Sequence, residues 1–150
     1  MRTIKINPFL LGLFIVVFAL SCSSDDSPNN SISQVESIVQ KGTWRITKLI
    51  DSGKNETNHF TGYNFTFHAT GILSANNGTN TFEGTWSITN SSSNDDSQDD
   101  LDFNINFNLT NDFEDLNDDW DIFSQSSTKI ELIDISGGNG GADYLTFEKN

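Results

Sequence analysis

The chain has 150 residues, and twenty-one Asp or Glu against eight Lys or Arg give it a formal net charge of −13. No Lys or Arg occurs between Lys54 and Lys129, while acidic residues recur throughout that stretch. Such a surface repels phosphate backbones and anionic headgroups, which excludes nucleic acid as a partner and leaves membrane contact to a lipid anchor.

The N-terminus has the pattern of a secretory signal. Arg2 and Lys5 form a basic head, and an apolar run follows from Phe9 to Leu20. This run is shorter than the roughly twenty residues that a membrane-spanning helix needs. We therefore predict that residues 1–21 are a signal peptide. Its removal leaves six basic residues against twenty-one acidic ones, a net charge of about −15.

The next residue, Cys22, is the only cysteine, so an intrachain disulfide is excluded. The stretch Ala19-Leu20-Ser21-Cys22 resembles the lipobox of bacterial lipoproteins. The resemblance implies that the sulfur of Cys22 carries a diacylglyceryl group, and each buried CH₂ of such chains contributes about 0.8 kcal/mol to membrane binding. The alternative is a free cysteine beside an ordinary cleavage site.

Three residues after the lipobox carry a second resemblance. Ser24, Asp25 and Asp26 resemble the surface-export signal of lipoproteins of the Bacteroidota, in its flavobacterial form. This implies an outer-membrane protein that faces the cell exterior. The alternative is an acidic linker without an export role. In either case residues 22–33, rich in Ser, Asp and Asn, predict a flexible tether.

Residues 34–150 predict one all-β domain preceded by a short helix. The helix is expected over 31–41, with Ser33 as its cap and Glu36 three residues later. After Gly42 the apolar residues alternate with polar ones, most clearly over 101–109, which is typical of antiparallel strands with one buried face. Strands are expected near residues 43–51, 61–68, 71–76, 79–89, 101–109, 119–125, 128–135 and 143–149.

Turn residues separate these strands. Gly71 and the pair Asn77-Gly78 predict hairpins, and the Gly-rich run 136–141 predicts another turn. The polar stretch 90–100 predicts a long loop, and 111–118 predicts one helical turn with Phe113 and Leu116 as its apolar face. The sum is an eight-stranded antiparallel meander barrel.

Two short motifs carry a resemblance to lipocalin-like domains. Gly42-Thr43-Trp44 opens the first strand, and Gly84-Thr85-Trp86 recurs in mid-chain. The first resembles the Gly-x-Trp signature of lipocalins, in which the Trp packs across the closed end of the barrel and an Arg of the last strand stacks on it. Here Lys149 is the only basic residue near that position. The alternative is a strand-start glycine followed by a core tryptophan in each motif.

The sequence predicts no enzyme, no cofactor and no metal site. His59 and His68 lack neighbours at metal-ligand spacing, and no G-x-S-x-G motif supplies a nucleophile. The acidic runs 94–100 and 112–121 lack the spacing of a calcium-binding loop, so we expect at most weak surface binding of Ca²⁺.

Two functions remain open. The first is a surface-tethered binding module for a small apolar ligand or another extracellular molecule. The second is a structural or protein-interaction lipoprotein of the envelope with a filled core, acting through loops such as 111–121 or 136–143. The candidate binding residues are the aromatic side chains Tyr63, Phe65, Phe103, Phe107 and Trp120.

Overall fold

The computed structural model describes residues 32–90, 101–135 and 141–150. The predicted signal peptide lies outside these ranges, as do Cys22, Ser24, Asp25 and Asp26, so the anchor and the export signal stay predictions. Most of the long polar loop and of the Gly-rich turn also lies outside them. Among the described residues, no helix has the length and apolar character needed to cross a membrane.

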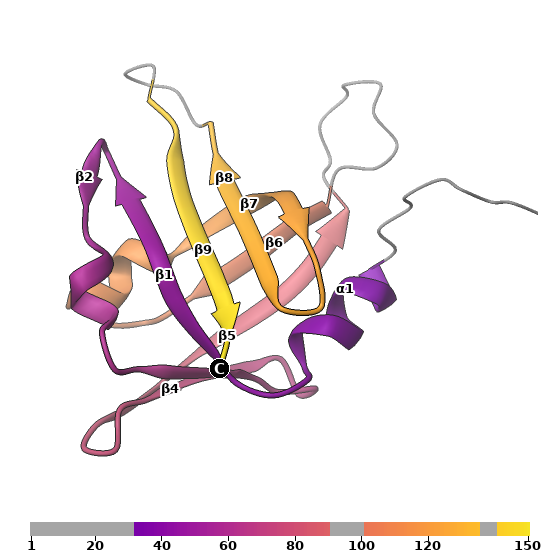
Figure 1. Ribbon diagram of the computed structural model, residues 1–150, viewed down its shortest axis with the longest axis horizontal. Coiled ribbons are helices and arrows are strands. Elements are labelled where there is room, and N and C mark those ends of the chain that lie inside the picture. The colour runs from indigo at the N-terminus through magenta and orange to yellow at the C-terminus, as the bar shows by residue number, and fades with distance from the viewer. Residues whose placement is uncertain (1–31, 91–100, 136–140) are drawn as a thin grey trace, which may run out of the picture.

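Eight antiparallel strands form a closed barrel after one short helix, as the sequence predicts (Figure 1). Each strand pairs with its neighbour in the chain, and the first pairs with the last. The elements are α1 (Ile32–Val39), β1 (Trp44–Asp51), β3 (Asn64–Phe67), β4 (Ile72–Asn76), β5 (Thr81–Asn90), β6 (Leu101–Asn106), β7 (Asp118–Gln125), β8 (Lys129–Asp134) and β9 (Asp143–Lys149). A two-residue strand, β2 (Lys54–Asn55), pairs antiparallel with the end of β1, and two 3₁₀ helices, η1 (Thr57–Phe60) and η2 (Asp112–Leu116), complete the described fold.

Several element boundaries differ from those predicted, and one helix was not expected. The helix α1 begins at Ile32, so Ser33 lies within its first turn and is not its cap. Strand β6 ends at Asn106 because the side chain of Asn117 forms hydrogen bonds with both the N–H and the carbonyl of Phe107, in place of a neighbouring strand. The Phe107 N–H donates to Asn117 Oδ1 at 2.5 Å, and Asn117 Nδ2 donates to the Phe107 carbonyl at 3.0 Å. The helix η1 was not predicted at all.

Both predicted hairpins are present. Gly71 has a φ of 80° and Gly78 a φ of 85°. These positive φ values favour glycine, because a residue with a Cβ is strained in this backbone conformation. The β4–β5 hairpin has a four-residue loop, since Asn76 pairs with Thr81. The side chain of Asn77 holds this loop by accepting hydrogen bonds from the backbone of the two residues before Thr81.

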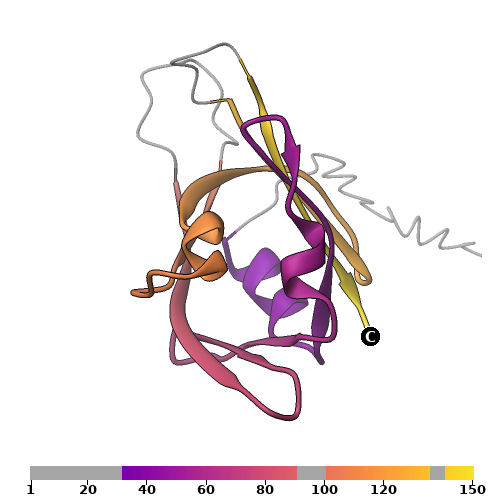
Figure 2. The same ribbon diagram turned by 90° about the vertical axis from the view of Figure 1, so that its left-hand side faces the viewer.

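Helical segments lie at the two ends of the barrel. Figure 2 looks into the barrel with η1 and η2 beside the near end and α1 toward the far end, and Figure 1 places them on opposite sides. The predicted apolar faces of the strands point inward. The buried residues include Trp44, Ile46, Leu49, Phe65, Phe67, Leu73, Trp86, Ile88, Leu101, Phe103, Ile105, Phe107, Trp120, Ile130, Leu132, Leu145 and Phe147.

Each of the three tryptophans ties its strand to a segment outside the sheet. In all three the indole N–H donates to a backbone carbonyl, which satisfies a polar group that burial would otherwise leave unpaired. The bonds run from Trp44 to Val39 (2.8 Å), from Trp86 to His68 (3.0 Å) and from Trp120 to Leu116 (3.1 Å).

The glycines of the two Gly-x-Trp motifs are needed for different reasons. Gly42 has a φ of 83° between α1 and β1. Gly84 has an ordinary backbone but no room: a Cβ there would lie 2.8 Å from the ring of Phe107 and nearer still to the carbonyl oxygen of Asn106. The second glycine therefore lets β6 pack closely on β5.

Candidate functional site

The candidate ligand residues lie inside the barrel, but the structure divides them between clusters. Phe65, Phe103 and Phe107 are fully buried and Tyr63 is partly buried. Trp120 is only 2% exposed and is therefore not a surface aromatic of the 111–121 loop. None of these five side chains is among the exposed large hydrophobic residues of the described ranges.

Phe113 of η2 is the centre of the first aromatic cluster, which closes one end of the barrel. Its ring lies against five others in edge-on or tilted geometry, the arrangement that aromatic pairs favour. The centroid distances are 4.7 Å to Phe82, 4.9 Å to Phe107, 5.2 Å to Tyr63, 5.3 Å to Phe60 and 6.2 Å to Phe65. The predicted apolar face of this helical turn thus fills the space that an open barrel end would leave.

Phe67 is the centre of a second cluster, deeper in the barrel. Its ring makes edge-on contacts with Trp86, Phe103 and Phe147 at 5.4–5.5 Å. Phe65 contacts Phe147 at 5.5 Å and so joins the two clusters. Aromatic side chains therefore extend in continuous contact from η2 through the interior, and the arrangement is that of a packed core.

Polar groups join η1 to η2 outside the first cluster. The ring of His59 lies between two carboxylates, with Nε2 at 3.5 Å from Glu56 and Nδ1 at 3.7 Å from Asp112. Burial, followed by the charge of Asp51, raises the pKa of Asp115 in the same region. This end of the barrel is acidic, and His59 is its counter-charge when protonated.

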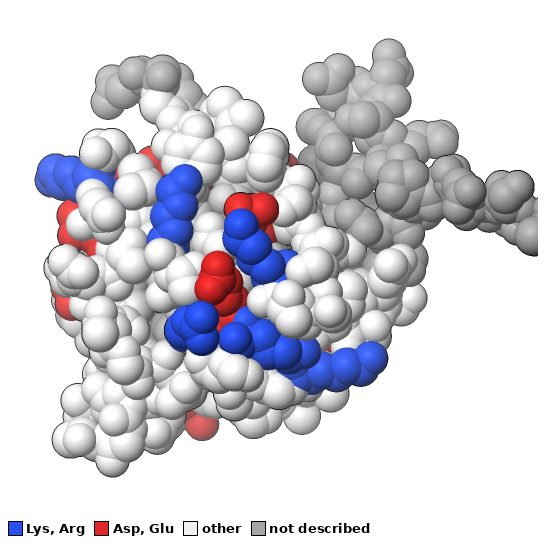
Figure 3. Space-filling model, in the orientation of Figure 1, with Lys and Arg blue, Asp and Glu red and all other residues white. Residues whose placement is uncertain are grey.

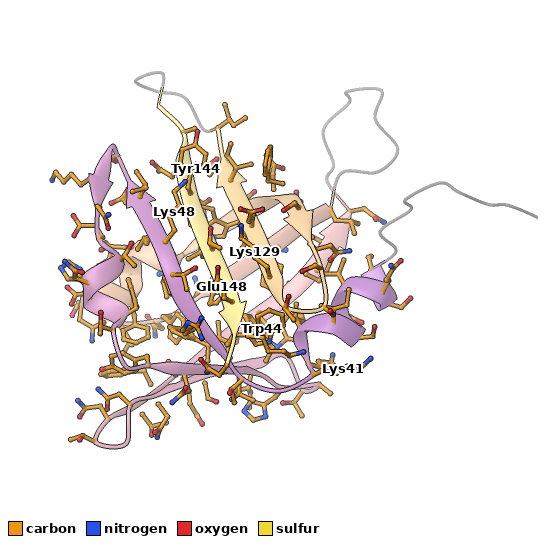
Figure 4. The ribbon with its side chains drawn as sticks, viewed as in Figure 1. Lys41, Trp44, Lys48, Lys129, Tyr144 and Glu148 are labelled. Atoms are coloured by element: carbon orange, nitrogen blue, oxygen red, sulfur yellow. The ribbon has the colours of Figure 1, made fainter. Side chains whose placement is uncertain are left out.

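The outer surface of β1, β9 and β8 is a separate candidate site. Strand register places its side chains in three rows across the strands, each with one residue from β1, β9 and β8 in that order. The charged row is Arg45, Glu148 and Lys129; the mixed row is Lys48, Thr146 and Glu131; the apolar row is Ile50, Tyr144 and Ile133. We call these nine residues the β1–β9–β8 face, of which Figure 4 labels Lys48, Tyr144, Lys129 and Glu148.

Contacts within and between the rows hold the charged groups. Arg45 Nη2 lies 3.2 Å from Glu148 Oε2, and Lys129 Nζ lies 2.6 Å from Glu131 Oε1. Lys48 Nζ lies 4.1 Å from the centroid of the Tyr144 ring, a cation–π contact. Hydrogen bonds from Lys129 and from Ser124 of β7 lower the pKa of Glu131. These hydrogen bonds favour the charged form of the Glu131 carboxyl.

Apolar side chains are exposed around the apolar row. Tyr144 is 37% exposed, Phe123 of β7 is 72% exposed and Ile135 after β8 is 66% exposed. Phe123 stands at a shift of register between Ile122 and Ser124, which explains why it points away from the core. Exposed apolar groups gathered in this way, with polar groups beside them, mark interaction surfaces.

Charge is divided unequally over the barrel. Every Lys and Arg that the structure describes lies on β1, β2, β8 or β9 or directly after α1, and β3 to β7 carry none. Figure 3 shows these side chains gathered on one face with acidic groups between them. The basic residues are Lys41, Arg45, Lys48, Lys54, Lys129 and Lys149. The stretch of sequence without Lys or Arg thus corresponds to the side of the barrel that β3 to β7 form.

Sequence reasoning did not find this face. Its residues stand at the polar positions of strands from both ends of the chain, and only the β1–β9 pairing brings them together. The exposure of Phe123 depends on the shift of register in β7, and no residue pattern in the sequence predicts that shift. The available signal was the restriction of Lys and Arg to the first and last strands.

Among residues 32–90, 101–135 and 141–150, no group of three or more His, Cys, Asp or Glu is arranged to hold a metal ion. No family model matches the chain, and no curated protein matches it. One solved structure similar to it is that of a DUF4847 family protein from Bacteroides vulgatus, with 21% identity and a TM-score of 0.48. That match covers 77% of this chain and 97% of the other. No family membership follows from a likeness of this size.

Proposed function

We propose that the protein is a non-enzymatic lipoprotein, anchored through Cys22 in the outer membrane and facing the exterior, whose barrel works through its outer surface. The observation that carries this proposal is the cluster around Phe113. Its rings occupy the barrel end and the interior positions where a small apolar ligand would have to enter and bind. An interaction module with a filled core therefore fits better than an interior carrier.

The lipocalin-like resemblance gains support as a proposal about architecture. The ammonium of Lys149 on the last strand lies 5.0 Å from the centroid of the Trp44 ring. It stands where the resemblance places an arginine stacked on the tryptophan. The proposal therefore treats the chain as a lipocalin-like barrel with a lysine in that role and a packed interior.

Binding of the neutral apolar dye Nile red tests the state of the interior. We expect no saturable binding of one dye per chain by the natural protein. The Phe113→Ala variant removes the central ring of the first cluster, and we expect it to bind the dye, because a ring-sized space lined by apolar groups accepts an apolar guest. Saturable binding by the natural protein at micromolar dye would favour the carrier function instead.

The anchor and its orientation have separate tests in the host cell. The Cys22→Ser variant is expected to leave the membrane fraction, and its retention there would contradict the anchor. The double variant Asp25→Ala, Asp26→Ala is expected to stay in the membrane fraction but to become resistant to external protease. Continued cleavage from outside would contradict the export role of these two residues.

A further inference from the structure

The β1–β9–β8 face differs from the rest of the described surface in two respects at once. It combines the apolar row, in which Tyr144 is exposed and Ile50 and Ile133 are half-buried, with basic groups, while β3 to β7 present only acidic charges. Ile72 of β4, at 39%, is the one large hydrophobic residue in the described ranges that is exposed away from this face and its neighbours Phe123 and Ile135. Among the residues that the structure describes, this face is therefore the one best suited to burial against another molecule.

We propose that the β1–β9–β8 face, with Phe123 and Ile135, is the docking site for a different protein of the envelope. The partner lays apolar side chains along the apolar row and carboxylates over the charged row. This inference rests on the proposed function, because it names the kind of partner through which an interaction lipoprotein of this fold acts. Aromatic and Arg side chains are enriched in such interfaces, and polar groups surround them.

A second copy of this chain fits the face poorly. In a dimer with its two-fold axis parallel to the strands, Arg45 of one copy would face Lys129 of the other. Glu148 would face Glu148, so like charges would meet along the whole row. A head-to-tail contact would pair the basic groups with the acidic side of the next copy. In the described ranges that side exposes Ile72 alone among large hydrophobic residues, so the contact would leave most of the apolar groups exposed.

An anionic lipid surface or glycan also fits poorly. Asp121 lies opposite Ile133 at one end of the apolar row, and the face itself carries Glu131 and Glu148. Bringing the apolar row to phosphates or sugar acids would bring these carboxylates with it. A protein surface can place carboxylates over the charged row and have none beside Asp121. A uniformly anionic surface cannot make this distinction.

The reach of the proposed tether is compatible with such a partner. Nine residues lie between Cys22 and Ile32 at the start of α1, so ten residue-to-residue steps join the two. At no more than about 3.6 Å per residue they hold the domain within roughly 36 Å of the bilayer. A partner in the same membrane therefore meets this face at a high effective concentration, and modest affinity is sufficient.

Site-specific photocrosslinking in the native host tests the proposal with the full chain. The photoreactive residue p-benzoylphenylalanine replaces Phe123 in one strain, Ile135 in a second and Thr79 in a third. Thr79 is the control because it is an exposed residue of the β4–β5 hairpin, away from the face. We expect one adduct of the same discrete mass from positions 123 and 135, and none from position 79.

Charge reversal supplies a matched pair of variants on the crosslinking background. Lys48→Glu changes the face itself, whereas Lys54→Glu makes the same change on β2, outside it. We expect Lys48→Glu to lower the adduct yield at least about fivefold, because like charges across an interface oppose binding, and Lys54→Glu to lower it less than about twofold. Equal effects would contradict a specific contact at the face.

Each other result overturns the proposal in a recognisable way. An adduct of twice the chain's mass means that a second copy occupies the face, and adducts with lipid or glycan alone mean an anionic surface. No adduct, or the same adduct from Thr79, means that the face does not dock a protein. Because the Cys22→Ser fractionation is independent of crosslinking, failure of docking is distinguishable from failure of the proposed anchor.

Discussion

The indole N–H of Trp44 donates a hydrogen bond to the backbone carbonyl of Val39 at 2.8 Å, across the junction of α1 and the barrel. Val39 is the last residue of α1, whose free carbonyls need partners from outside the helix. Trp44 is fully buried. One residue thus fills the end of the barrel and fixes the helix upon it.

Replacement of Trp44 by Phe tests this connection. The variant keeps an aromatic ring but leaves the Val39 carbonyl without its donor and a gap beside α1. We expect the free energy of unfolding to fall by about 2–4 kcal/mol in chemical denaturation. Amide exchange in α1 should also become faster. Tyr144→Phe, which removes a hydroxyl at the surface, is the control, and an equal loss in both variants would contradict the proposed role of the bond.

Gly84→Ala tests the close approach of β6 to β5. The added Cβ would meet the Phe107 ring and the Asn106 backbone, neither of which can move freely. We expect a loss of about 2–3 kcal/mol from overpacking. Gly78→Ala is the matched control, because its Cβ meets nothing within 4 Å and only its positive φ opposes the change, at about 1 kcal/mol. A smaller loss at Gly84 than at Gly78 would refute the packing argument.

Asp118 makes stability depend on pH. Burial raises its pKa from 3.8 to about 6, so the folded protein holds this proton more tightly than the unfolded chain does. The contribution of Asp118 to stability is therefore complete below pH 3.8 and is lost as pH rises through about 6. Asp118→Asn should raise the melting temperature at pH 7 and have little effect at pH 3.5. An equal shift at both pH values in scanning calorimetry would show that charge is not the cause.

The exposed apolar residues should contribute to binding and not to stability. Phe123→Ser and Ile135→Ser are expected to change the free energy of unfolding by less than about 0.5 kcal/mol, as exposed positions usually do. Phe67→Ala, in the second aromatic cluster, should cost about 3–5 kcal/mol. Comparable losses at the exposed and buried positions would mean that Phe123 packs against the protein in solution.

Much of the barrel could be predicted because its inner and outer faces alternate along each strand. Leu101, Phe103 and Ile105 are buried on β6 while Asp102 and Asn104 between them face outward, as the period of two requires. The end of β6 could not be predicted, because it depends on the side chain of Asn117, eleven residues beyond Asn106 in the chain. Alternation along one strand carries no information about such a partner.

The candidate site depends on distances that the sequence does not contain. The aromatic residues of the interior were identified by strand pattern, but whether they line a space or fill it depends on Phe113, which lies in a connection between strands. The β1–β9–β8 face depends on the pairing of the first strand with the last and on the register that sets Arg45 beside Glu148. Both features arise from long-range packing.

The central claim is that a filled barrel acts through its surface, and native mass spectrometry of the full protein from its own host membrane tests it most directly. We predict a chain whose mass includes covalent acyl groups, with no small apolar molecule held non-covalently, together with a complex containing one different protein. A stoichiometric apolar ligand that leaves the chain only on unfolding would contradict the claim.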